Sequence, residues 1–239
     1  STWILGIHDG HDAAAALLHE GRVVAAVSEE RIQRVKSAAG YPAGAIAACL
    51  AQAGIGASDI GHVALAGTRA VPVNLLGTLS TFEIRDHYRI QEELRRPKFY
   101  EGRSVPFARL FPNYRPKGTV GYPLDRIPLK ESQELAADEK AALTEFRLGY
   151  IAEQLGIARE RIAVLDHHRC HAFYARFAAP FRGQNVAALT MDAGGDGVYD
   201  SVNLFDARGR HTRLHASHDC LIGPMYTYIT LLLGMRPFE

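Results

Sequence analysis

Two histidines and one aspartate in this chain have the residue types and spacing needed to hold a metal ion. His167 and His171 are four residues apart, so on a helix they share one face. Asp192 follows the apolar run Val186–Met191 and opens the glycine-rich segment Asp192–Gly197. Two imidazoles and a carboxylate leave coordination positions open for a ligand oxygen, as catalytic metal sites do. We therefore predict a metal site made by His167, His171 and Asp192.

The elements around the histidines are predicted from hydrophobic periodicity. The apolar run Ile162–Leu165 indicates a strand, and the helix predicted over His168–Phe177 would carry His171. A longer amphipathic helix is predicted upstream, over Glu139–Leu155, and Gly156 would end it. Its buried face is expected to hold Ala142, Phe146, Gly149 and Tyr150.

One strand pattern occurs twice. In the first copy, the strand Trp3–His8 ends in the turn Asp9-Gly10-His11-Asp12, and a hairpin of Ala13–His19 and Arg22–Ser28 follows. In the second copy, the strand Val186–Met191 ends in the turn Asp192–Gly197, and a hairpin of Val198–Phe205 and Arg210–Ser217 follows. Asp9 and Asp192 occupy matching places, and acids in such turns would hold a nucleotide's metal ion.

The duplication predicts an α/β fold of the actin-like (ASKHA, ribonuclease H-like) class, a duplicated βββαβα fold that is incomplete in this chain. In that fold two glycine turns face one cleft, and their backbone N–H groups approach a nucleotide's phosphates. Two unrelated β-meanders would also fit the pattern. A helix over Pro42–Ala53, ended by Gly54, and a strand over Ile60–Ala66 complete a first unit, residues 1–70.

The segment Val71–Gln133 interrupts this pattern. It has little periodicity, many Pro and Tyr residues, and a basic cluster from Arg85 to Arg103. A loop of this length usually has a function, so we interpret residues 71–133 as an insertion that borders a site. A solvated charged helix over Glu83–Arg96 followed by a surface loop fits equally well. Residues 186–239 would form the start of the second half, with a helix over Ile229–Gly234 near their end.

Composition excludes several classes of protein. The chain has 239 residues, of which 47% are hydrophobic and 22% are charged, and its net charge is +1. These values are typical of globular domains and give no reason to expect nucleic acid or a membrane as partner. Its three cysteines are odd in number and widely spaced, which favours reduced thiols and a cytoplasmic protein.

Six segments of the chain form a recognisable series, in the order Ile4–Leu18, Ala25–Lys36, Tyr41–Ile46, Asp166–Ala172, Met191–Gly197 and Leu233–Glu239. Together they resemble the motifs of one enzyme family, the O-carbamoyltransferases of nodulation-factor and antibiotic biosynthesis (NodU/CmcH type). The resemblance skips the insertion. Two residues depart from the family pattern: Asp196 stands where Glu is frequent, and Ser37 replaces a frequent His after Lys36.

The resemblance implies that residues 1–239 are a truncated N-terminal carbamoyltransferase domain, similar to that of the tRNA threonylcarbamoyl-transfer enzyme. Such domains have the actin-like ATPase fold and bind iron through a His-x-x-x-His pair and acids. By this resemblance His167 and His171 carry the metal, with Asp192 as third ligand. Fe²⁺ is the implied ion, and Zn²⁺ or Mn²⁺ would suit the same ligands. A C-terminal YrdC-like domain, absent from this chain, would make carbamoyl-adenylate from ATP and carbamoyl phosphate.

Transfer from an adenylate to an alcohol requires a base and groups that stabilise the leaving phosphate. His11 is the expected base, with Asp12 as its orienting partner or as a second base. Lys36 and Arg34 would supply positive charge. The backbone N–H groups of Gly10, Gly194, Gly195 and Gly197 would face the phosphate. Of the residues beside the metal pair, His168 is expected to point away and cap the helix, and Cys170 is expected in the core.

The sequence therefore predicts an ATP-dependent O-carbamoyltransferase that modifies a hydroxyl of a natural product or sugar. The expected partners are a small hydroxylated acceptor and the C-terminal domain of the same polypeptide, and a homodimer is possible. Two alternatives remain open at this point. One is a small-molecule kinase on the same fold, which would normally use Asp and Mg²⁺ rather than paired histidines. The other is a non-catalytic ATP-binding or scaffold protein.

Overall fold

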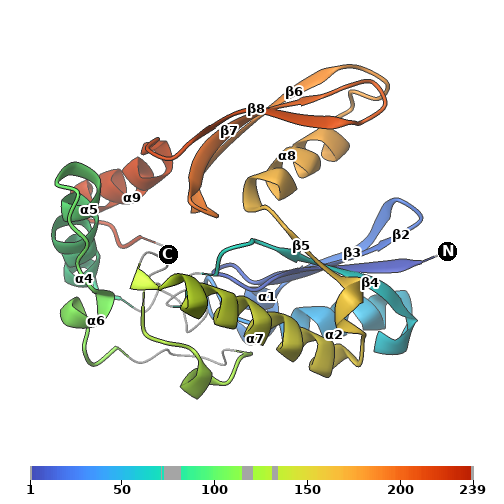
Figure 1. Cartoon of the computed structure of the whole chain (residues 1–239), viewed down its shortest axis with the longest axis horizontal. Helices are drawn as coiled ribbons and strands as arrows, with labels where there is room; N and C mark the ends of the chain where they lie inside the picture. The colour runs from blue at the N-terminus through green and yellow to red at the C-terminus, as the bar shows by residue number, and fades with distance from the viewer. Residues whose placement is uncertain (1, 71, 73–81, 115–120, 131–133, 238–239) are drawn as a thin grey trace.

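The computed structural model describes residues 2–70, 72, 82–114, 121–130 and 134–237, and its strands form two sheets (Figure 1). The first sheet contains β1 (Trp3–His8), β2 (Ala14–His19), β3 (Arg22–Ser28), β4 (Ile60–Ala66) and β5 (Ile162–Leu165). The second contains β6 (Val186–Gly195), β7 (Val198–Phe205) and β8 (His211–Ser217). All the predicted strands are present, but β6 extends past the predicted end at Met191, so most of the predicted glycine turn is strand.

The strand order identifies the fold. In the first sheet the order is β3-β2-β1-β4-β5, with β1, β2 and β3 antiparallel and β4 and β5 parallel to β1. The second sheet, β6-β7-β8, repeats the opening antiparallel meander. This is the arrangement of the actin-like, ribonuclease H-like fold, and the predicted α/β duplication is confirmed. Because β1, β4 and β5 are parallel, the residues that follow them meet at one edge of the sheet.

Two helices cover one face of the first sheet: α2 (Ala43–Ala53) and α7 (Ala137–Leu155) (Figure 1). The predicted helix over Pro42–Ala53 begins one residue later, with Pro42 at the N-cap and Gly54 as a left-handed C-cap. Leu5, Ile7 and Leu17 point from the sheet into this core and are almost fully buried. Short elements complete the layer: α1 (Glu29–Gln33), η1 (Ala57–Asp59) and η6 (Arg159–Arg161).

The predicted buried face of α7 is only partly right. Phe146 and Tyr150 pack half-buried against the core, but Ala142 and Gly149 are exposed. The fully buried residues of the helix are Leu143, Arg147, Leu148, Ile151 and Leu155. A charged residue, Arg147, lies in the middle of this buried face. Arg147 is nevertheless only 1% exposed, since it has a buried carboxylate partner described below.

The insertion has its own small core. It contains α4 (Ile84–Arg89), the π-helical segment η3 (Ile90–Arg95), α5 (Arg96–Tyr100), α6 (Phe107–Leu110) and η4 (Leu124–Arg126). Phe82, Ile90, Leu94, Phe107 and Leu110 pack together. The expected solvated helix is therefore partly buried. The remaining residues of the insertion (71, 73–81, 115–120 and 131–133) lie outside the described residues.

The insertion also contacts the second half of the chain. α9 (Ile222–Leu232) begins well before the predicted helix start at Ile229 and lies beside α4 and α5 (Figure 1). The Tyr88 hydroxyl donates to the carbonyl of Leu231 at 2.8 Å, and the Tyr228 hydroxyl donates to Glu92 at 3.2 Å. Phe99 packs edge-on against Tyr199, with ring centroids 5.9 Å apart. The insertion thus bridges the two halves.

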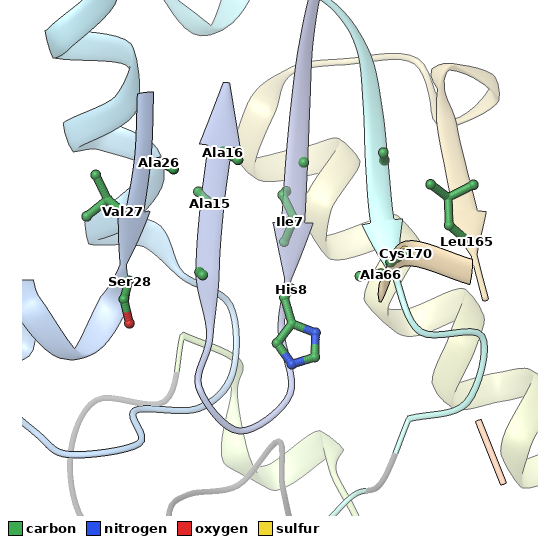
Figure 2. A pocket seen from close by; sticks show the side chains of 13 residues that line it. Ile7, His8, Ala15, Ala16, Ala26, Val27, Ser28, Ala66, Leu165 and Cys170 are labelled. Atoms are coloured by element: carbon green, nitrogen blue, oxygen red, sulfur yellow. The ribbon is translucent and has the colours of Figure 1, made fainter. Parts of the chain in front are cut away.

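The other face of the first sheet carries small side chains (Figure 2). A hollow of about 430 Å³ lies over it, and its lining includes Ala14, Ala16, Ala26, Ala64 and Ala66. His8, at the carboxyl end of β1, and Cys170 border the same hollow (Figure 2). None of the described helices is both long and apolar enough to span a membrane.

Candidate metal centre

The histidine pair lies at the start of α8 (His167–Ala178), directly after β5. Asp166 is the N-cap, and its carboxylate accepts a hydrogen bond from the backbone N–H of Arg169 at 2.7 Å. The same carboxylate pairs with Arg213 of β8. The helix start is therefore fixed to the second sheet, and His167 and His171 project one turn apart.

A buried polar chain fixes the rotation of α8. His168 is fully buried; its Nδ1 lies 2.7 Å from the Thr190 hydroxyl, and its Nε2 donates to the carbonyl of Val198 at 2.9 Å. The Thr190 hydroxyl lies 2.7 Å from the Ser201 hydroxyl, and the side-chain amide of Asn203 donates to that Ser201 hydroxyl at 2.8 Å. His168 points away from the metal pair as predicted, but it anchors the helix rather than capping it. A satisfied buried network of this kind favours one orientation of the helix.

The three predicted ligands lie together, with one donor atom from each within 4.8 Å of the other two. His167 Nε2 is 2.6 Å from Asp192 Oδ2 and 3.0 Å from His171 Nε2, and His171 Nε2 is 3.6 Å from Asp192 Oδ2. Donors on a tetrahedral ion with bonds of about 2.0–2.1 Å stand roughly 3.3 Å apart, so these separations fit one ion. The His171 side chain is 52% exposed, which leaves an open side for a ligand.

His167 and Asp192 of the triad shift one another's pKa values. Burial alone would raise the pKa of Asp192, but hydrogen bonds from His167 and His171 outweigh burial and hold that pKa far below its usual range. Burial likewise disfavours the charged form of His167, but the facing Asp192 carboxylate outweighs it and raises the pKa of His167. Both shifts favour the charged forms of the two side chains, and a divalent ion would replace the proton between them.

Gly195 makes room for His167. A Cβ at Gly195 would overlap the His167 ring, so the strand approaches the imidazole only because this position has no side chain. The turn that follows consists of Asp196 and Gly197, whose φ values of 56° and 83° are typical of a type I′ hairpin with an Asp-Gly sequence. This turn holds Asp192 and His167 in contact.

Asp196 joins three segments. Its Oδ2 accepts from the backbone N–H of Thr68 at 2.9 Å and from that of His167 at 2.7 Å. Its Oδ1 accepts from the N–H of Arg69 at 2.7 Å. One carboxylate therefore connects the loop after β4, the first residue of α8 and the β6–β7 turn. Asp196 was noted in the sequence only as a departure from the family pattern, and nothing local indicated its contacts.

His8 is a residue of this site that the sequence analysis missed. Its ring lies edge-on to His167, with centroids 6.2 Å apart, and its Nε2 donates to the carbonyl of His11 at 3.0 Å. Burial lowers the pKa of His8. Gly10, predicted to face a phosphate, provides space for this ring, since a Cβ there would lie 3.1 Å from it. Strand alternation could have placed His8 on the open face of the sheet.

The other predicted catalytic residues lie on the segments that follow β1 and α1. His11 and Asp12 are both exposed, with Nε2 and Oδ2 3.7 Å apart. Lys36 forms an ion pair with Glu30, Nζ to Oε2 3.4 Å, and Arg34 is exposed. Cys170 is half-buried and borders the hollow of Figure 2 rather than the core, which corrects the prediction.

The predicted parallel between Asp9 and Asp192 holds for position but not for contacts. Asp9 is 1% exposed and forms a two-pronged ion pair with Arg147, at 2.6 and 2.7 Å. The Tyr122 hydroxyl donates to the same carboxylate at 2.6 Å. Burial opposes ionisation, but Arg147 outweighs it and lowers the pKa of Asp9. With these partners, Asp9 is a structural ion-pair residue and not a second metal acid.

Comparison with known proteins gives the family. The model of the carbamoyltransferase N-terminus matches residues 3–83 and 131–238 and leaves out most of the insertion. The chain belongs to this family. Nodulation protein NolNO of Sinorhizobium fredii is 45% identical over 189 residues, which cover 78% of this chain and 20% of that protein. The uncharacterized protein sll1178 of Synechocystis is 29% identical over 248 residues, covering 98% of this chain and 32% of that protein.

The carbamoyltransferase N-terminus described here thus spans about a third or less of the length of these two relatives. Among solved structures, YeaZ from Pseudomonas aeruginosa is 14% identical, with a TM-score of 0.36, covering 90% of this chain and 65% of that one.

Proposed function

We propose that this domain is the acceptor-side half of an ATP-dependent O-carbamoyltransferase, which moves a carbamoyl group from carbamoyl phosphate through carbamoyl-adenylate to a hydroxyl. The observation that carries the proposal is the His167–His171–Asp192 triad at the edge where the strands of the first sheet end, in a chain of this family. Two imidazoles with one carboxylate suit Fe²⁺, Zn²⁺ or Mn²⁺ better than the Mg²⁺ of a kinase, which favours transfer over the kinase alternative.

The bound ion would act as a Lewis acid on the phosphate of the adenylate. His167, His171 and Asp192 would hold it, and Asp196 would keep His167 in place through its backbone N–H. The half-exposed His171 lies on the open side of this arrangement, where a ligand oxygen can approach.

His11 is the proposed base for the acceptor hydroxyl. It would take the hydroxyl proton as the acceptor oxygen forms a bond to the carbamoyl carbon. The bond between that carbon and the phosphate oxygen then breaks, and AMP leaves with the electron pair. Asp12 lies 3.7 Å from the His11 ring and can orient it, and the bond from His8 to the His11 carbonyl supports the loop.

The remaining expectations form part of the same proposal. Arg34 and Lys36 follow α1 and would contribute positive charge near the reacting oxygens. The backbone N–H groups of Gly10, Gly194, Gly195 and Gly197 would face the phosphate. The acceptor is a hydroxylated small molecule, either a sugar or another natural product, and the YrdC-like domain of the same polypeptide would supply the adenylate.

The test uses the full-length protein with ATP, carbamoyl phosphate and a panel of hydroxylated acceptors, with products identified by mass spectrometry. We expect a product heavier by one carbamoyl group, together with AMP. His167→Ala and His171→Ala should lose bound metal and transfer while circular dichroism stays unchanged. His62→Ala is the matched control, because His62 is an exposed histidine at the far end of β4. Undiminished transfer by either metal-site variant without bound metal would refute the proposal.

A further inference from the structure

Two cations, Arg69 and Lys140, lie where the loop after β4 meets the start of α7. Arg69 follows β4 and is exposed, and Lys140 lies in the second turn of α7 and is also exposed. Among the described residues, neither the Arg69 guanidinium nor the Lys140 ammonium has a hydrogen bond or an ion pair. Elsewhere in the described chain, arginine side chains such as Arg89, Arg96, Arg147 and Arg213 are paired with carboxylates.

The backbone of Arg69 is tied to the metal site. Its N–H donates to Asp196 at 2.7 Å, and the same carboxylate accepts from the N–H of His167. The guanidinium lies over the β6–β7 turn, where a Cβ at Gly197 would come within 2.5 Å of Arg69 Nη1. His218 donates from Nδ1 to the carbonyl of Gly197 at 2.8 Å. The turn that positions His167 therefore also has a cationic side chain held against it.

Arg69 and Lys140 line one small cavity. Its walls are Thr68, Arg69, Ala70, Leu135, Lys140, Leu143 and Thr144, and its volume is about 30 Å³. This space admits one water molecule or one oxygen of a ligand, not a whole phosphoryl group. Two cations and two hydroxyl-bearing residues around a space of this size are suited to an anionic oxygen.

We propose that Arg69, assisted by Lys140, is the phosphoryl-binding contact next to the metal triad, and that it determines affinity for the phosphate of the nucleotide. This proposal rests on the proposed function, since it names residues that recognise its adenylate. The charges at the site support this proposal. The negative charges of the Asp192 and Asp196 carboxylates neutralise a divalent ion, so further cations are needed to neutralise the phosphoryl group. Arg69 and Lys140 are available for it among the described residues, and a planar guanidinium suits a phosphoryl group.

Binding measurements on the full-length protein loaded with Mn²⁺ test this proposal. Adenosine, AMP and inorganic phosphate are titrated calorimetrically into wild type, Arg69→Ala, Arg69→Lys and Lys140→Ala. Arg22→Ala is the matched control, because Arg22 is an exposed arginine at the opposite end of the sheet. We expect Arg69→Ala to weaken AMP and phosphate binding by about 10- to 100-fold, with adenosine and Mn²⁺ affinity unchanged. Arg69→Lys should recover part of the loss, and Lys140→Ala should have a smaller effect.

The outcomes separate this proposal from the proposed function. AMP affinity within twofold of wild type in Arg69→Ala overturns the Arg69 assignment and leaves carbamoyl transfer standing. An equal loss for adenosine also overturns it, since the residue would then be structural. A selective loss for AMP and phosphate in a protein that transfers no carbamoyl group supports the phosphoryl site and refutes the proposed function. Wild type that binds neither AMP nor phosphate refutes the site.

Discussion

The imidazole of His167 occupies the space where Gly195 would carry a side chain. This contact joins the first turn of α8 to the end of β6, so a metal ligand on a helix is positioned by a missing methyl group on a strand. Gly195 is therefore part of the geometry of the triad, although it donates no ligand atom.

Gly195→Ala should displace His167 and disrupt the metal site. The added Cβ cannot be accommodated without moving either the ring or β6, so we expect metal affinity to fall by at least about 100-fold. Calorimetric titration with Mn²⁺ or Zn²⁺ measures this. Gly149→Ala is the control, because Gly149 is exposed on α7 with open space around its Cβ position; alanine there should stabilise the helix by about 1 kcal/mol. Unchanged metal affinity in Gly195→Ala would show that the ring can move freely.

Asp196→Asn should weaken both the junction between the halves and the metal site. The amide keeps one acceptor oxygen but loses the charge that strengthens three backbone hydrogen bonds, so we expect a loss of about 1–3 kcal/mol in unfolding free energy. Because the residue has positive φ, Asn is tolerated there and the turn should persist. Urea denaturation gives the stability, and Asp206→Asn, in the turn after β7, is a control outside the site. Equal effects of the two substitutions would contradict a special role for Asp196.

Breaking the Asp9–Arg147 pair from one side should destabilise the first half strongly. Arg147→Met leaves a buried carboxylate without its cation, which costs about 3–5 kcal/mol. The double variant Asp9→Asn/Arg147→Met should recover much of that loss, because no uncompensated charge remains. If the loss of unfolding free energy in the double variant equals the sum of the losses in Asp9→Asn and Arg147→Met, the two side chains are not energetically coupled.

The same pair predicts a pH dependence of stability. The pKa of Asp9 is lowered below its ordinary value of 3.8, so the folded state binds this proton less readily than the unfolded state. The stabilisation is therefore fully present above pH 3.8 and is lost as the pH falls through the folded pKa. Acid denaturation should be steeper in the wild type than in the double variant. Identical acid profiles would be inconsistent with the ion pair.

Much of this fold follows from local sequence. Runs of strand-forming residues bounded by turns predicted each strand in the described part of the chain, and Gly54 and Gly156 marked two helix ends. The His-x-x-x-His spacing and the acid that follows the apolar run Val186–Met191 were sufficient to predict the triad. These features depend on residues close together in the sequence, and hydrophobic periodicity predicts structure at that range.

The remaining features depend on contacts between distant segments. Nothing local in the sequence pairs Arg147 with Asp9, because the two residues are 138 positions apart. His8 resembled an ordinary strand residue until β1 and α8 were seen to meet. The roles of Asp196 and Arg69 follow from the loop after β4 lying against the β6–β7 turn, and the core of the insertion required non-periodic aromatic contacts.

Metal affinity should rise with pH through the pKa of His167. The Asp192 carboxylate raises that pKa above its ordinary value of 6.5, so a proton must leave before the imidazole can bind an ion. We expect apparent affinity to increase as the pH rises above 6.5, with a proton released on binding. Titration in buffers of different ionisation enthalpy counts that proton. Affinity that is independent of pH over this range would contradict the assigned ligand.

The central claim is that one divalent ion binds between His167, His171 and Asp192. Anomalous diffraction from crystals of the full-length protein, collected at the iron absorption edge after anaerobic loading with Fe²⁺, tests it most directly. We expect a single strong peak within bonding distance of both Nε2 atoms and of Asp192 Oδ2. No peak there, or a peak at another site with these three side chains turned apart, would contradict it.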